Sequence, residues 1–225
     1  MISTLPHIEL ETAPNPTASI IWMHGLGADG NDFVPIVDEM ELPARPLRFI
    51  FPHAPVRPVT INGGFMMRAW YDVVSDDFSR REDEGGVRES QAMIEALIRR
   101  ENERGICCAD IVIAGFSQGG AMALHTGLRY PERFAGVLAL STYVPVPKTL
   151  EAEMSQANRD VPIFMAHGTA DPVIPLWLAG SSRQLLERLG YDVQWHEYVM
   201  GHSVMWEEVA DVSHWLQRIL AAARS

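Results

Sequence analysis

The stretch from Asp110 to Gly120 reads Asp110-Ile111-Val112-Ile113-Ala114-Gly115-Phe116-Ser117-Gln118-Gly119-Gly120. Its first half is continuously apolar, which is typical of a strand buried on both faces of a parallel sheet. A G-x-S-x-G pattern follows, and an amphipathic helical pattern comes after it. A serine on such a sharp strand-to-helix turn is exposed, and the turn needs small neighbours because two backbones pack closely there. The stretch therefore predicts a nucleophilic Ser117 at the edge of an α/β sheet.

Strand-like and helix-like segments alternate along almost the whole chain, which indicates a mostly parallel sheet with helices on both faces. Apolar stripes predict helices over residues 87–98, closed by Gly105, and over residues 205–220. Because no linker, repeat or low-complexity tract interrupts the pattern, we expect one domain over residues 1–225. The expected strands are His7–Leu10, Ser19–Met23, Leu47–Phe51, Asp110–Ala114, Gly136–Leu140, Pro162–Ala166 and Val193–Tyr198.

The composition and cysteine usage fit a cytoplasmic protein. A net charge of −11 over 225 residues argues against nucleic acid and anionic membrane surfaces as main partners. The apolar runs are of strand length, so no stable membrane insertion is expected, and the N-terminus lacks the pattern of a signal peptide. The adjacent Cys107 and Cys108 are interpreted as free thiols in a reducing compartment. The sequence leaves a homodimer open.

One stretch, residues 52–84, departs from the alternation. It holds several prolines, the pair Gly63-Gly64 and a run of large apolar side chains. A long irregular connection in a compact domain is often functional, and a surface excursion with its own small apolar cluster is the alternative. The sequence leaves both interpretations open.

Four unusual segments each follow an expected strand: His24–Gly27, the serine turn, His167–Pro172 and Gly201–Ser203. Loops that follow parallel strands emerge at the same edge of a sheet, where ligands bind. We therefore expect Ser117, Asp171 and His202 to meet there beside a glycine-rich turn.

Each of these three residue types has a chemical reason to be present. A serine hydroxyl needs a base that takes its proton, and a histidine can accept that proton and later donate it. A carboxylate on the other ring nitrogen fixes the tautomer and stabilises the imidazolium. The chain order Ser117, Asp171, His202 is that of α/β-hydrolases. Other acids and histidines are placed less well, because they precede strands or lie within strands and helices: Asp160, Asp192, His125, His196 and His214.

The negative oxygen of a tetrahedral intermediate needs donors that already point at it. We expect them to be the backbone N–H groups of Gln118, at the start of a helix, and Leu26, so backbone orientation should matter more there than side-chain identity.

The segment Gly25–Gly30 also matches the dinucleotide-binding pattern G-x-G-x-x-G. The next strand ends Phe49-Ile50-Phe51-Pro52-His53 without the acidic residue that this use requires. No histidine or cysteine cluster has metal-ligand spacing, so neither a metal nor another cofactor is expected.

With these residues in view, the chain resembles the carboxylesterase and acyl-protein thioesterase family of α/β-hydrolases. The matching segments run in family order over nearly the whole chain, and they are His24–Gly30, Pro52–Pro55, Trp70–Asp72, Gly115–Gly120, His167–Pro175 and Gly201–Ser203. The resemblance implies an α/β-hydrolase fold without a large cap domain. It also implies Ser117, Asp171 and His202 as the catalytic triad and Leu26 and Gln118 as the oxyanion-hole donors.

The expected activity is hydrolysis of small-molecule carboxylic esters with short- to medium-chain acyl groups, through an acyl-serine intermediate. The alternative is an acyl-protein thioesterase or lysophospholipase that acts on long acyl chains. A non-enzymatic binding module is disfavoured because the triad is complete. Large side chains near the serine edge are candidates for the acyl pocket, with ordinary core packing as the other interpretation, and they are Met66, Trp70, Tyr143, Val144, Leu176 and Trp177.

Overall fold

The computed structural model describes residues 4–75 and 82–221, and its centre is a seven-stranded sheet in the order β1-β3-β2-β6-β7-β8-β9. β1 runs antiparallel to β3 at one edge, and every other neighbouring pair in this sheet is parallel. The strands are β1 His7–Glu11, β2 Ala18–Met23, β3 Leu47–Pro52, β6 Ile111–Phe116, β7 Gly136–Leu140, β8 Ile163–Gly168 and β9 Val193–Tyr198. All seven expected strands are present, with ends that differ by at most two residues.

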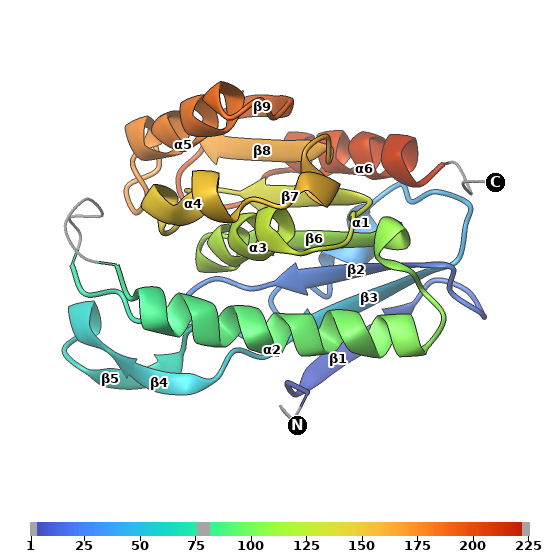
Figure 1. The fold of residues 1–225 in the computed structure, drawn as a ribbon, viewed down its shortest axis with the longest axis horizontal. Helices are drawn as coiled ribbons and strands as arrows, with labels where there is room; N and C mark the ends of the chain where they lie inside the picture. The colour runs from blue at the N-terminus through green and yellow to red at the C-terminus, as the bar shows by residue number, and fades with distance from the viewer. Residues whose placement is uncertain (1–3, 76–81, 222–225) are drawn as a thin grey trace.

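Helices cover both faces of the sheet, as Figure 1 shows with α2 to α5 in front and α1 and α6 behind. The helices are α1 Ile36–Glu39, α2 Glu84–Glu103, α3 Gln118–Arg129, α4 Pro147–Glu153, α5 Leu176–Arg188 and α6 Trp206–Leu220, with short 3₁₀ turns η1 Thr60–Asn62, η2 Cys108–Asp110 and η3 Gln156–Asn158. The α/β-hydrolase architecture expected from the sequence is confirmed, and no large cap covers the described part of the chain.

Strand alternation builds two separate cores. In β2, Ile21 and Met23 point to the face covered by α2 to α5, whereas Ile20 and Trp22 point to the face covered by α1 and α6. Because successive side chains of a strand point to opposite faces, a strand that packs on both sides must be apolar throughout. This explains why the central strands read as continuous apolar runs.

The irregular stretch 52–84 contains a small hairpin that the alternation pattern did not predict. β4 (Val56–Val59) pairs antiparallel with β5 (Phe65–Arg68), and η1 lies between them. Gly63 and Gly64 have φ of 68° and 79°, a conformation that favours glycine at this turn. Residues 76–81 of the stretch lie outside the described residues.

Candidate active site

Ser117 sits on a strained turn between β6 and α3. Its φ of 54° and ψ of −121° are unusual for a residue with a side chain. A Cβ on Gly115 would lie 2.2 Å from the carbonyl carbon of Gly119, and a Cβ on Gly119 would lie 2.2 Å from the carbonyl oxygen of Met23. The turn therefore brings β6, the start of α3 and the end of β2 together at glycine positions.

A methyl group on Gly119 is expected to destabilise the protein. The contact is with backbone of β2, which cannot move aside as a flexible side chain could, so Gly119→Ala should lower the free energy of unfolding by about 2–3 kcal/mol. Gly180→Ala is the matched control, because a Cβ on this helical glycine meets nothing within 4 Å. That control should raise the stability by about 0.5–1 kcal/mol. Urea denaturation measures both, and equal stabilities of the two variants would contradict the packing described for the turn.

The loops after β6, β8 and β9 bring three side chains together at the carboxyl edge of the sheet. His202 Nε2 lies 2.9 Å from Ser117 Oγ, and His202 Nδ1 lies 2.7 Å from Asp171 Oδ2. When His202 Nδ1–H donates to the carboxylate, Nε2 carries a free lone pair and accepts the Ser117 hydroxyl proton. The three residues are far apart in the chain and form one hydrogen-bonded relay.

Asp171 is held from its other side by backbone donors. Its Oδ1 accepts hydrogen bonds from the N–H groups of Val173 at 2.8 Å and Ile174 at 2.9 Å. His167 Nε2 lies 3.4 Å from Asp171 Oδ2 and donates to the Ile174 carbonyl at 2.8 Å. Burial lowers the pKa of His167, so this ring is neutral and does not compete as a cation for the carboxylate. Asp171 is therefore oriented toward His202 by contacts that leave Oδ2 available.

Leu26 and Gln118 lie beside Ser117, and all three line the same cavity. The turn that holds Leu26 approaches the serine closely, since a Cβ on Gly25 would lie 3.4 Å from Ser117 Cβ. Within the described residues, neither the Leu26 N–H nor the Gln118 N–H donates to another backbone group. Gln118 also starts α3, where the helix dipole favours negative charge.

His24 fixes the loop that carries Leu26. Its Nδ1–H donates to the Gly25 carbonyl at 2.7 Å, and its Nε2 accepts from the Ala54 N–H at 3.1 Å. Burial lowers its pKa to about 4, which keeps the ring neutral so that Nε2 can accept. Trp70 Nε1–H donates to the His24 carbonyl at 2.9 Å. No role for this histidine was predicted from the sequence, although it belongs to the unusual segment His24–Gly27.

The side chain of Gln118 makes two hydrogen bonds that the sequence pattern did not predict. Its Oε1 accepts from the Trp70 N–H at 2.7 Å, and its Nε2 donates to the Tyr71 carbonyl at 2.7 Å. A buried amide that satisfies two backbone groups ties the segment after β5 to the serine turn. The side chain of Gln118 therefore has a structural role in addition to the backbone role expected from the sequence.

An apolar cavity of about 230 Å³ opens beside Ser117 on the side of Leu26 and Gln118. Of the six residues expected in an acyl pocket, Tyr143 lines this cavity, and its hydroxyl lies 3.0 Å from that of Tyr71. The remaining lining residues are Leu26, Ile61, Asn62, Tyr71, Val73, Ser117, Gln118, Val173 and Ile174.

The other five expected pocket residues lie elsewhere. The Trp70 ring is fully buried in the core beneath the loop of His24, and Val144 is buried with its N–H donating to Ser182 Oγ. Met66 and Trp177 are 64% and 62% exposed, and Leu176 begins α5 outside the lining. Several of these residues lie in the same segments as the lining residues, but the direction of each side chain depends on the loop conformation.

The rival histidines have structural surroundings. His125 is buried in α3, with Nε2 hydrogen-bonded to Gln91 Oε1 at 3.0 Å, and His196 in β9 stacks on Phe164. Neither lies in the relay with Ser117. These positions agree with the expectation that they are packing residues.

Comparisons with known proteins identify the family of this chain. A family model described as phospholipase/carboxylesterase matches residues 6–220. The acyl-protein thioesterase 1 of Neurospora crassa is 40% identical over 222 residues, covering 94% of this chain and 90% of that protein. The Yarrowia lipolytica protein of the same name is 36% identical over 218 residues, covering 94% and 96%.

Solved structures of similar proteins share this fold. Arabidopsis thaliana SOBER1 superposes with a TM-score of 0.85 at 30% identity, covering 90% of this chain and 99% of that one. Zea mays acyl-protein thioesterase 2 superposes with a TM-score of 0.81 at 28% identity, covering 95% and 99%.

Fold and comparisons together define an ester hydrolase of the α/β-hydrolase class. More particularly, the chain belongs to the phospholipase/carboxylesterase family. In the described part of the chain, no helix combines the length and apolar character that crossing a membrane requires.

Proposed function

We propose that the protein hydrolyses carboxylic esters and thioesters through an acyl-serine intermediate. The observation that carries this proposal is the single histidine that contacts both the serine hydroxyl and the buried carboxylate, His202 between Ser117 and Asp171. This arrangement activates a serine that would otherwise be a poor nucleophile.

In the first half-reaction, Ser117 Oγ bonds to the acyl carbon while His202 Nε2 takes the hydroxyl proton. The tetrahedral intermediate collapses when the bond to the leaving oxygen or sulfur breaks, and His202 gives that atom the proton. A water molecule then repeats the sequence on the acyl-serine and releases the acid. Asp171 keeps Nδ1 protonated throughout and stabilises the imidazolium.

The proposed oxyanion donors are the N–H groups of Leu26 and Gln118. Donors that are oriented before reaction stabilise the developing charge without reorganisation at the transition state. His24 and the Gln118 side chain hold the two loops on which these donors lie. We therefore assign His24 as a positioning residue, not as an acid or base.

The volume of the cavity beside Ser117 fits a medium-chain acyl group. A methylene group is close in size to a water molecule, whose share of liquid volume is about 30 Å³. A cavity of about 230 Å³ would therefore enclose an acyl chain of roughly eight carbons. The experiment that tests this assignment is a profile of kcat/KM against acyl length, from acetyl to palmitoyl, on matched oxygen and sulfur esters. A maximum near octanoyl is expected.

A long-chain acyl-protein thioesterase is the second candidate. It is favoured by the relatives of that name and by exposed apolar side chains on the hairpin that borders the cavity. Phe65 is 73% exposed and Met66 64%, while Ile61, which lines the cavity, is 43% exposed. An acyl chain too long for the cavity could continue along them. A kcat/KM maximum at palmitoyl thioester would favour this candidate over the first.

Narrowing the cavity is expected to shorten the preferred acyl chain. Val73 lines the cavity and takes no part in the relay, so Val73→Trp should exclude the distal part of an octanoyl chain. Losing the contacts of three methylene groups costs about 2.4 kcal/mol, or roughly 60-fold in kcat/KM. Acetyl ester should be hydrolysed almost as before. Val199→Trp, at a residue that is 90% exposed, is the control. An unchanged octanoyl-to-acetyl ratio in Val73→Trp would show that the acyl chain binds elsewhere.

We also propose a reducing, cytoplasmic location. Cys107 is exposed and Cys108 is buried, and both are free thiols. Unpaired cysteines of this kind are typical of compartments that keep thiols reduced. Localisation of a tagged chain in its own cells would test this assignment.

A further inference from the structure

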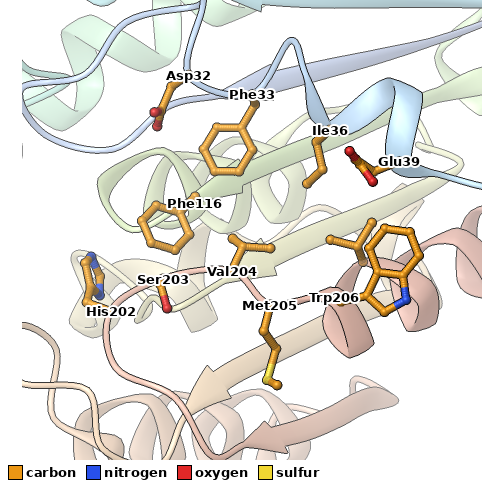
Figure 2. Close-up of a pocket in the computed structure, with 11 residues that line it drawn as sticks. Asp32, Phe33, Ile36, Glu39, Phe116, His202, Ser203, Val204, Met205 and Trp206 are labelled. Carbon is orange, nitrogen blue, oxygen red and sulfur yellow. The ribbon is translucent and has the colours of Figure 1, made fainter.

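A second cavity of about 430 Å³ opens beside His202 (Figure 2). Its apolar lining comes from α1 and the segment before it, from Phe116, and from the loop before α6 together with the first turn of α6. Figure 2 shows Phe33 and Phe116 side by side, with His202 at one end of the cavity and Trp206 at the other. The Phe116 ring lies 4.8 Å from the His202 ring and 5.6 Å from the Phe33 ring, measured between centroids.

This cavity is separate from the proposed acyl cavity. The two cavities have no lining residue in common. Ser117 lines the first cavity, and His202 lines the second. In the proposed reaction the acyl carbon bonds to Ser117, and the departing atom receives its proton from His202. The leaving group must therefore lie on the side of His202, which is where the second cavity opens.

The charges at this cavity have one sign. Asp32 and Glu39 line it, and its lining contains no arginine or lysine. Within the described residues, neither carboxylate forms an ion pair. Partial burial raises the pKa of Asp32, and the nearby Asp29 carboxylate raises it further. The ring of Trp206, which is 62% exposed, adds a π-face that attracts cations.

We propose that this second cavity binds the leaving group of the substrate and selects alcohols or thiols that carry a positive charge on an apolar body. The apolar part of the lining fits the body, and the two carboxylates with the exposed Trp206 ring fit the charge. This inference rests on the proposed ester hydrolysis and adds the chemical class of the leaving group to it. When the acyl–oxygen or acyl–sulfur bond breaks, the leaving group takes the proton held by His202 and departs as the neutral alcohol or thiol function.

The test compares three octanoyl esters that differ only in the alcohol. Octanoylcholine carries a quaternary ammonium, and 3,3-dimethylbutyl octanoate replaces its nitrogen with carbon. Methyl octanoate has a leaving group too small to fill the second cavity. Each kcat/KM is divided by the rate constant for hydrolysis of that ester by hydroxide, because the positive charge also makes choline a better leaving group. The corrected choline-to-dimethylbutyl ratio is expected to be about three to ten, as two exposed charge contacts and a cation–π contact would give.

Removing the two carboxylates should remove the preference. In the double variant Asp32→Asn, Glu39→Gln, the corrected ratio is expected to fall close to one. The matched control is Glu103→Gln, Glu151→Gln, which changes the net charge equally at two exposed positions on α2 and α4 and should keep the wild-type ratio. A fall in both double variants would assign the preference to the overall charge and overturn the cavity as its origin.

The remaining outcomes separate this inference from the proposed function. A corrected wild-type ratio of one or less, with methyl octanoate hydrolysed, overturns the inference and leaves the esterase in place. An unchanged ratio in Asp32→Asn, Glu39→Gln does the same. Failure of the wild-type protein to hydrolyse any of the three esters overturns the proposed function, and the inference with it.

Discussion

Replacing Ser117 with alanine is expected to lower kcat for octanoyl ester by roughly 10⁵- to 10⁶-fold, the scale seen when the nucleophile of a serine triad is removed. Ser117 Oγ is the atom that His202 Nε2 contacts at 2.9 Å, and among residues 4–75 and 82–221 no other hydroxyl is hydrogen-bonded to that nitrogen. Alanine also lacks the atom that forms the acyl intermediate. The remaining activity should come from water attack assisted by the oxyanion donors alone.

The control for this variant is Ser181→Ala on α5, whose hydroxyl donates to the Trp177 carbonyl away from the relay. It should keep wild-type kcat. Circular dichroism and the thermal unfolding midpoint should show that Ser117→Ala folds as the wild-type protein does. Retention of more than about 1% of wild-type kcat in folded Ser117→Ala would contradict the assignment of the nucleophile.

Replacing Asp171 with asparagine is expected to lower kcat by about 10⁴-fold, with the fold intact. Asparagine Oδ1 can still accept from the Val173 and Ile174 N–H groups, so the loop should keep its conformation. The amide then presents an N–H toward His202 Nδ1, which favours the tautomer protonated on Nε2. That tautomer cannot take the proton of Ser117.

Asp192→Asn serves as the control for this change, because Asp192 is an exposed acid outside the relay, just before β9. The KM of Asp171→Asn should change little, because the carboxylate contacts the histidine and not the acyl chain. A loss of less than tenfold in kcat, or a loss confined to KM, would remove Asp171 from the relay.

The sequence predicted the sheet well because the pattern of each central strand has one cause. A strand between two helical layers is apolar at every position, as Ile111 to Ala114 are, and the loops after such strands meet at one edge. Ser117, Asp171 and His202 could therefore be placed together from the order of strands and motifs alone. No side-chain conformation was needed for that step.

The parts that escaped prediction depend on side-chain direction. The ring of Trp70 turns into the core because its Nε1–H bonds to the His24 carbonyl, and the sequence pattern carries no sign of this. The hairpin of β4 and β5 is short and has prolines in and before it, so its alternation is too weak to detect. The second cavity joins Phe33 to Trp206, residues far apart in the chain that belong to no shared motif.

The central claim is that His202 and Asp171 activate the Ser117 hydroxyl. The most direct measurement is the rate and position of labelling by a fluorophosphonate, which reacts with activated serines, read by intact mass and by peptide mapping. We expect one adduct per chain, located on Ser117, and much slower labelling in Asp171→Asn. An adduct on another residue, no adduct on the folded wild-type protein, or equal labelling rates in wild type and Asp171→Asn would contradict it.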